Sequence, residues 1–232
     1  MVKNQGRIIM AEQPLINIEQ ESSKKWLLPI ILATMTLITS GLLMFSHAIT
    51  ADKIAAIQLA NKLASLQRLI PADVIDNNLL EDAIEIFEPV LLGHRQTETL
   101  YLGIKNNRIN VMAIPVTARN GYSGDIELLV GVYVGGKLNG QITAVEIIAH
   151  KETPGLGDLI EAKKSDWLLQ FPGTSLQQPT EKKWRVKKDQ GAFDQITAAT
   201  ITPRAVVGAI KQALLFQRDF ELNKHSTIEN QP

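Results

Sequence analysis

The stretch DQITAATITPRAVV, from Asp194 to Val207, takes the chain from a loop into its last long helix. Thr202 is a favourable N-cap residue and Pro203 a favourable first helical residue, so together they predict where this helix begins. The first turn of a helix leaves backbone N–H groups unpaired and carries the positive end of the helix dipole. Three threonines and one arginine fall within eight residues here, which suits a phosphate or a phosphate ester. Most threonines before a helix are only caps, and that reading stays open.

The residues before this stretch predict an antiparallel sheet. Turn signals at Asn106-Asn107 and Gly135-Gly136 separate short runs that are rich in β-branched residues. The runs are Thr99–Lys105, Ile109–Thr117, Ile126–Val134 and Gln141–Ala149.

Helical patterns surround the predicted sheet. The spacing of apolar residues predicts helices over Ala51–Ile70, Asp76–Leu92, Gly155–Phe171 and Pro203–Leu222. A polar loop is expected over 172–183 and a short strand at Trp184–Val186, while Trp167 and Trp184 are interpreted as core residues. The expected class is α+β: an N-terminal transmembrane helix, then an extracytoplasmic domain with an antiparallel sheet and flanking helices.

Near the N-terminus, Leu27–Ile49 contains no Asp, Glu, Lys or Arg. A helix of this length crosses a hydrocarbon core about 30 Å thick. Lys24 and Lys25 precede the segment and predict a cytoplasmic N-terminus by the positive-inside rule. A cleaved signal peptide is the alternative, since Ser46-His47-Ala48 resembles a cleavage site, but the apolar run is longer than a signal peptide needs.

These patterns predict five regions along the chain. They are a cytoplasmic segment (1–25), a transmembrane helix (26–49), a helical linker region (50–92), a periplasmic domain (93–222) and a flexible tail (223–232).

The composition excludes several classes of site. The chain has no cysteine, so disulfides, thiolate metal sites and iron–sulfur ligation are excluded. Its 24 basic residues equal its 24 acidic residues, which argues against a nucleic-acid partner. No two of its four histidines stand at the spacing of metal ligands on a helix, so no metal site is expected.

Three motifs in this order resemble FMN-binding domains that a periplasmic flavin transferase modifies. Gly121-Tyr122-Ser123-Gly124 is similar to a G-Y-x-G turn, and residues 150–158 are similar to an H-x-E-T-P-G-L-G-D element. Residues 194–200 resemble the signature D-x-x-[S/T]-G-A-T, in which the last threonine forms a phosphoester with FMN. Within that family, the continuation ITPRAVV (201–207) is similar to the G subunits of Rnf ion-translocating oxidoreductase complexes.

The resemblance implies that Thr200 carries covalent FMN. It implies further cofactor-binding residues at Asp194, Thr197, Ala198, Ala199, Arg204, Glu152, Thr153, Gly155, Leu156, Gly157, Gly121 and Tyr122. One departure stands out, because Ala198 occupies the position of the signature glycine. If that position needs left-handed backbone, alanine costs about 1–2 kcal/mol there.

The resemblance also implies a function. The chain would be an electron-transfer component of an ion-translocating oxidoreductase in the bacterial inner membrane, with no catalysis of its own. Its partners would be the other membrane and peripheral subunits, the flavin transferase and the inner membrane itself. Two alternatives remain: the C subunit of a sodium-pumping NADH:quinone reductase, and an exported anchor domain without flavin.

Overall fold

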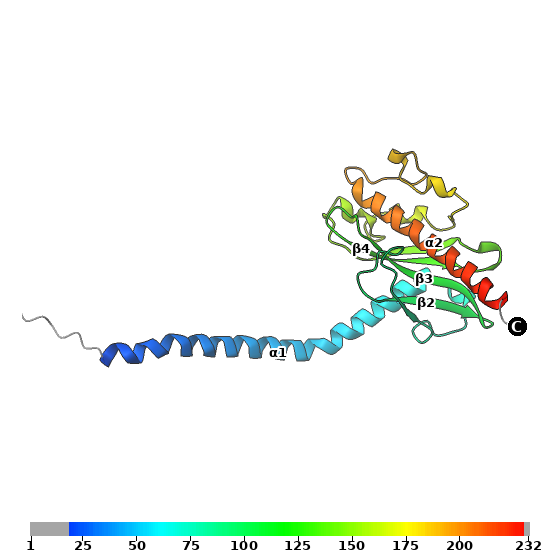
Figure 1. The fold of residues 1–232 in the computed structure, drawn as a ribbon. Helices are drawn as coiled ribbons and strands as arrows, with labels where there is room; N and C mark the ends of the chain where they lie inside the picture. The colour runs from blue at the N-terminus through cyan, green and yellow to red at the C-terminus, as the bar shows by residue number, and fades with distance from the viewer. Residues whose placement is uncertain (1–18, 230–232) are drawn as a thin grey trace, which may run out of the picture. The chain divides into compact units, whose positions relative to one another are not determined.

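The computed structural model describes residues 19–229, with α1 (Glu19–Leu69) at one end of the chain and α2 (Ile201–Glu229) at the other (Figure 1). Contacts divide the chain into two compact units between Leu59 and Ala60. The expected N-terminal segment falls, up to residue 18, outside the described residues. At the other end α2 continues past Leu222 to Glu229, through most of the region expected to be a flexible tail.

The first unit is the apolar part of α1. Within the described residues, one helical stretch, Lys25–Ala51, is long and apolar enough to cross a membrane, with a mean hydropathy of 2.1. Its threonines bond back to the helix, as Thr34 Oγ1 does to the Ile30 carbonyl at 2.7 Å, so these hydroxyls need no water. This confirms the expected helix over Leu27–Ile49 and is consistent with a single-pass anchor.

The second unit contains a five-stranded antiparallel sheet in the order β1-β2-β3-β4-β5. The expected meander is therefore confirmed, and a short edge strand that the sequence pattern missed is added to it. The strands are β1 (Ile84–Ile86), β2 (Glu98–Lys105), β3 (Arg108–Ala118), β4 (Ile126–Tyr133) and β5 (Ile142–Ala149).

Both faces of the sheet are covered, because successive side chains of a strand point to opposite faces. Along β3, Met112 and Ile114 belong to the core cluster that includes Val206 and Ile210 of α2. Val111 belongs instead to the cluster formed by the last turn of α1, with Leu66, Leu69 and Ile70. The sheet thus holds the first turns of α2 in position through these core contacts.

Two expected helices are wrong. In place of a helix over Asp76–Leu92, the chain makes turns and β1, because the Asn77 side chain bonds to both Ile104 N and Leu102 O and so pairs this segment with β2. In place of a helix over Gly155–Phe171, the chain makes only the 3-10 turns η3 (Gly157–Ile160) and η4 (Trp167–Gln170). Two further 3-10 turns follow, η5 (Glu181–Lys183) and η6 (Lys187–Asp189).

An aromatic cluster holds the long connection between β5 and α2. Phe193 packs against Trp184 with ring centroids 4.5 Å apart and against Phe171 at 5.0 Å. Trp167 meets Phe171 edge-on at 5.2 Å, and all four rings are buried. The expectation that Trp167 and Trp184 serve the core is confirmed. The expected strand at Trp184–Val186 is reduced to a single bridge between Val186 and Phe193.

Candidate functional site

A tight turn precedes α2. The Ala199 N–H donates to the Ile196 carbonyl at 3.1 Å, which closes a four-residue turn over Ile196–Ala199. Ala198, third in this turn, has a φ of 64°, and neither Ile196, Thr197 nor Ala199 has a positive φ. That pattern is the type II turn, whose third position favours glycine. The structure therefore puts Ala198 in the left-handed conformation, where the related signature has glycine.

Thr200 occupies the N-cap of α2. Its carbonyl accepts a hydrogen bond from Arg204 N at 3.3 Å, four residues on, so the helix begins at Ile201. The expectation that Thr202 is the cap is wrong, because the buried Thr202 hydroxyl bonds to another segment. Among the described residues the Thr200 hydroxyl has no hydrogen-bond partner, and its side chain is half-buried. The Thr200 hydroxyl therefore lies unbonded beside the positive end of the α2 dipole.

The three sequence motifs meet at the carboxylate of Glu152, which is only 5 % exposed. Its Oε2 accepts a hydrogen bond of 2.6 Å from Thr202 Oγ1, in the first turn of α2. Its Oε1 accepts one of 3.0 Å from the backbone N–H of Ser123, in the G-Y-x-G turn. A buried carboxylate must be paired or hydrogen-bonded. Glu152 therefore ties the second motif to the first and to the residues after the third.

Two glycines allow this close approach. A Cβ on Gly157 would lie 2.6 Å from Glu152 Oε2, and one on Gly121 would lie 2.9 Å from Oε1. Neither distance is open to a real side chain, so these positions need glycine for space and not for a special φ.

The outer surface of the site is formed by residues of the same two motifs. Thr153 O accepts backbone N–H groups of Leu156 and Gly157 at 3.2 and 3.1 Å, which folds the loop tightly around Gly155 with its φ of 77°. Thr153, Gly155 and Leu156 are exposed, and Tyr122 is 69 % exposed. Exposed apolar and aromatic surface beside a helix N-terminus can receive a flat ring system.

A network of charged and hydrogen-bonding side chains stabilises the loop around Gly155. The three sequence motifs alone did not indicate this network. His150 Nδ1 accepts the Glu152 N–H at 3.0 Å, so Nε2 carries the proton and donates to Glu161. The Lys164 ammonium donates to Asp158 Oδ2 at 2.9 Å and to Glu161 Oε1 at 2.6 Å. These hydrogen bonds hold the pKa of both carboxyls below their ordinary values, although burial opposes the shift.

Two predicted site residues, Asp194 of the third motif and Arg204 in the first turn of α2, form ion pairs within the protein. The exposed Asp194 pairs with Lys187 at 2.5 Å, and its carbonyl accepts the Trp167 indole N–H at 2.7 Å. The Arg204 guanidinium donates two hydrogen bonds, of 2.6 and 2.8 Å, to the Asp189 carboxylate. The guanidinium lowers the pKa of the Asp189 carboxyl, and the carboxylate raises the pKa of Arg204. Arg204 thus forms an ion pair with Asp189, close to the turn that precedes α2.

The residues present fit FMN. Thr200 offers an unbonded hydroxyl for an ester, and the backbone N–H groups of Ile201 and Thr202 have no partner among the described residues. These groups suit a phosphate, while Leu156 and Tyr122 suit a ring system. A hollow of about 410 Å³ lies toward the other end of α2, lined by residues such as Asn139 and Gln217, and includes none of the predicted site residues.

Several known proteins are similar to this chain in sequence. The family described as FMN-binding domain matches residues 121–215, which include all three motifs. The G subunit of the ion-translocating oxidoreductase complex of Pseudomonas aeruginosa is 40 % identical over 199 residues, 86 % of this chain and 90 % of its own. That of Pseudoalteromonas atlantica is 39 % identical over 197 residues, covering 85 % and 88 %.

Two more proteins are similar. The corresponding G subunit from Vibrio cholerae is 37 % identical over 204 residues, 88 % of this chain and 93 % of its own. Among solved structures, NqrC of Shewanella oneidensis aligns with a TM-score of 0.36 and 17 % identity, over 65 % of this chain and 78 % of that one. On the strength of the curated relatives, this chain belongs to the family of G subunits of ion-translocating oxidoreductase complexes and contains its FMN-binding domain.

Proposed function

We propose that this chain carries FMN as a phosphoester on Thr200 and passes electrons within its oxidoreductase complex. FMN, when bound, accepts and donates one or two electrons, while the protein supplies attachment and orientation. The single observation that supports Thr200 most strongly is its place: its hydroxyl is unbonded at the N-cap of α2, one residue after the type II turn.

The proposed site extends across the three motifs. Thr200 anchors the phosphate, and the N–H groups that open α2 receive its charge. The loop around Gly155 and Leu156, together with Tyr122, forms the surface on which the ring lies. Glu152 positions both parts, since its two oxygens join the Ser123 turn to Thr202. The remaining motif residues shape the two loops: Thr153, Gly157, Thr197, Ala198, Ala199 and Asp194. Arg204, in the first turn of α2, binds Asp189.

The orientation is part of the proposal. Lys24 and Lys25 stand before the apolar stretch, which favours a cytoplasmic N-terminus and a periplasmic FMN domain. A covalent tether is useful on that side of the membrane, because a dissociated flavin would be lost by dilution. A periplasmic flavin transferase would then be the protein that modifies Thr200.

In-gel flavin fluorescence of membranes tests this function. A denaturing gel of cells that contain the transferase should show a fluorescent band at the mass of this chain, 25.6 kDa. Thr200→Ala should abolish the band, whereas Thr180→Ala should leave fluorescence because it removes an exposed hydroxyl outside the three motifs. An unchanged band in Thr200→Ala would contradict the anchor. A dark band from the natural chain would favour the alternative of an anchor domain without flavin.

A further inference from the structure

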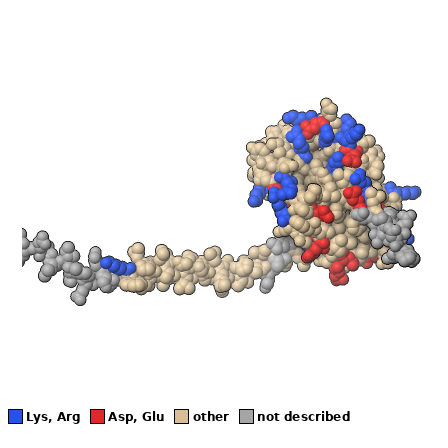
Figure 2. All heavy atoms as spheres, in the orientation of Figure 1, with Lys and Arg blue, Asp and Glu red and all other residues tan. Residues whose placement is uncertain are grey.

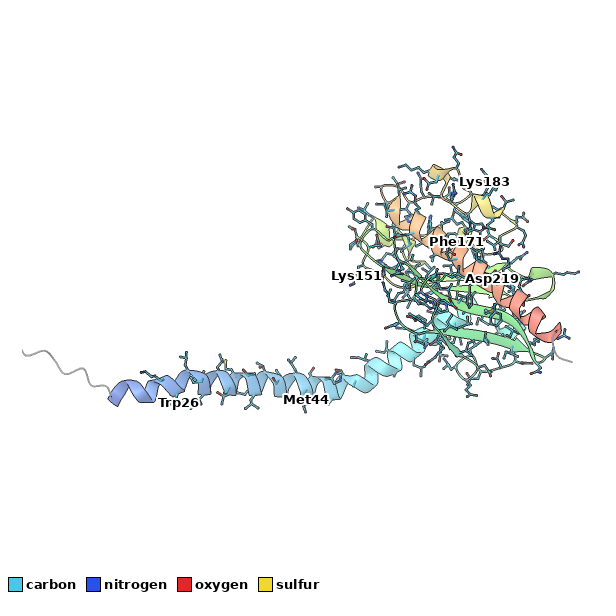
Figure 3. The ribbon with its side chains drawn as sticks, in the orientation of Figure 1. Trp26, Met44, Lys151, Phe171, Lys183 and Asp219 are labelled. Carbon is cyan, nitrogen blue, oxygen red and sulfur yellow. The ribbon has the colours of Figure 1, made fainter. Side chains whose placement is uncertain are left out.

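A cationic segment lies beside the proposed attachment turn. Between Glu181 and Gln190 the chain carries five cations, Lys182, Lys183, Arg185, Lys187 and Lys188, against two acids, Glu181 and Asp189. Figure 2 shows Lys and Arg gathered at the upper end of the folded domain, over the segment that Figure 1 colours yellow to orange, and Figure 3 labels Lys183 at this surface.

Both acids of this segment are already paired with cations from α2. Glu181 pairs with Lys211 at 3.2 Å and lies 3.7 Å from Arg218. Asp189 is held by both nitrogens of the Arg204 fork. Within the described residues the two acids therefore form no ion pair with the segment's own cations, although after Arg204 the nearby Arg185 and Lys188 also help to lower the pKa of Asp189.

Four of the five cations form no ion pair with a carboxylate among the residues that the structure describes, and three of these four also donate no hydrogen bond from their side chains. Lys187 pairs with Asp194, and Lys183 donates to the Gln190 carbonyl. Lys182, Arg185 and Lys188 are exposed and form no ion pair within the described part of the chain. Like charges on one short segment repel one another and weaken the fold slightly, and they attract a partner of opposite charge.

The segment is held rigidly in place. Its residues alternate between charged positions that face water and the buried Trp184 and Val186, which are 3 % and 0 % exposed. The Trp184 indole donates to the Ser175 carbonyl at 2.9 Å, and its ring packs on Phe193. The cations are thus displayed from a fixed backbone and not from a loose tail.

The same backbone leads directly to the attachment turn. Lys187 N donates to the Phe193 carbonyl at 2.7 Å, and Lys188 N donates to the Gln195 side chain at 3.2 Å. Phe193 and Gln195 flank Asp194, the first residue of the attachment motif. The cationic segment is therefore bonded to the start of the motif that ends at Thr200, and Asp189 is bonded to Arg204 in the first turn of α2.

We propose that Lys182, Arg185 and Lys188 form a docking surface for an acidic face of the enzyme that attaches the flavin. The inference rests on the proposed function, because it supposes that such an enzyme must approach Thr200. Complementary charge speeds the encounter of two proteins by about 10- to 1000-fold, and salt suppresses the effect. The cationic surface therefore raises the rate at which the two proteins associate and does not change the chemical step that forms the ester.

Kinetics of flavin attachment test this surface. Full-length chain made without the transferase, in nanodiscs of neutral lipid, is incubated with purified flavin transferase and FAD. Attack of the Thr200 hydroxyl on FAD would break its pyrophosphate bond, leaving FMN on Thr200 and releasing AMP. Initial rates are followed by covalent flavin fluorescence. The variant K182Q/R185Q/K188Q should raise KM for the chain about tenfold, with kcat and the KM for FAD unchanged. It should also remove most of the salt dependence of kcat/KM.

The control variant K105Q/R108Q/K137Q removes the same charge near the opposite end of the sheet, and it should behave as the natural chain does. The charge reversal K182E/R185E/K188E should be slower still. Equal effects of the two glutamine variants would overturn the docking surface, and so would a defect seen only in nanodiscs with anionic phosphatidylglycerol, which would assign the cations to lipid. Natural chain that takes up no flavin at all would instead overturn the proposed function, and the inference with it.

Discussion

At the scale of the residue, Ala198 has a strained backbone conformation that lowers the stability of the fold, and its neighbours do not. Its φ of 64° lies where a Cβ crowds the following carbonyl oxygen, and glycine avoids this crowding. The turn persists because the residues on either side hold it: Ile196 and Ala199 are buried, and Asp194 is fixed through Trp167.

Replacing Ala198 by glycine should therefore stabilise the domain. We expect Ala198→Gly to raise the free energy of unfolding by about 1 kcal/mol, the relief of left-handed strain being partly offset by the greater freedom of unfolded glycine. Urea denaturation of the full chain in detergent measures it. The control is Ala199→Gly, one position on and without positive φ, which should lower stability by about 0.5–1 kcal/mol. A loss of stability in both variants would contradict a strained turn.

The bond between Glu152 and Thr202 makes a second prediction at this scale. Thr202→Val keeps the shape but leaves a buried carboxylate oxygen unpaired, which should cost about 2 kcal/mol in unfolding free energy. Thr202→Ser keeps the hydroxyl and loses one buried methyl group, so about 1 kcal/mol is expected. If Glu152 positions the site, Thr202→Val also lowers flavin incorporation at Thr200 at a temperature where both variants are folded. Equal incorporation would show that the bond serves stability alone.

The sequence pointed to the tight loops through their glycines and to a helix start at Thr202 and Pro203, but it pointed to Thr200 only through the resemblance of residues 194–200 to the family signature. It could not show that Thr202 leaves the cap position to Thr200, since the partner of its hydroxyl lies 50 residues away. The role of His150 was hidden for the same reason, because its ring bonds to Glu152 and to Glu161 only after the loop closes.

At the scale of the element, the η3 loop is held by Lys164. Its ammonium lowers the pKa of Asp158 and Glu161 below their ordinary values of 3.8 and 4.5. A carboxyl whose pKa is lower in the folded chain stabilises the fold above its unfolded pKa, and this contribution is lost as the pH falls through the folded value. Acid should therefore loosen this loop below about pH 4.

Substitution of Lys164 tests that assignment. Lys164→Met should flatten the fall in unfolding free energy between about pH 5 and 2, because the two carboxyls no longer gain from the ammonium. Lys163→Met changes the neighbouring exposed lysine, which has no ion pair in the described part of the chain, and should keep the natural slope. Thermal unfolding followed at several pH values measures both. Identical slopes in the two variants would contradict the role of Lys164.

Whether an element could be predicted from the sequence depends on whether its stabilising contacts lie within the element or come from distant residues. The strands and α2 carry their own periodicity, so the patterns over 99–149 and 203–222 located them. The stretches 76–92 and 155–171 have apolar residues at similar spacing, yet distant groups decide their form: Asn77 bonds to β2, and the Trp167 indole of η4 donates to the Asp194 carbonyl. Ile160, Trp167 and Leu168 are buried, but they lie in turns and not in a helix.

At the scale of the whole molecule, the proposed orientation gives a further prediction. The chain has no cysteine, so a single introduced thiol reports its side of the membrane without background. In spheroplasts, Lys137→Cys should react with a membrane-impermeant maleimide, and Gln5→Cys should react only after lysis. The reverse pattern would contradict a periplasmic FMN domain, and absence of residues 1–48 from the mature chain would establish the cleaved signal peptide instead.

The most direct test of the whole account is peptide mass spectrometry of the chain purified from cells with an active flavin transferase. Proteolysis should yield the peptide that spans Asp194–Arg204 with one FMN phosphoryl group, and fragmentation should place that group on Thr200 and not on Thr197 or Thr202. The same peptide recovered without modification, or modified at another threonine, would contradict the claim that the cap of α2 anchors the flavin.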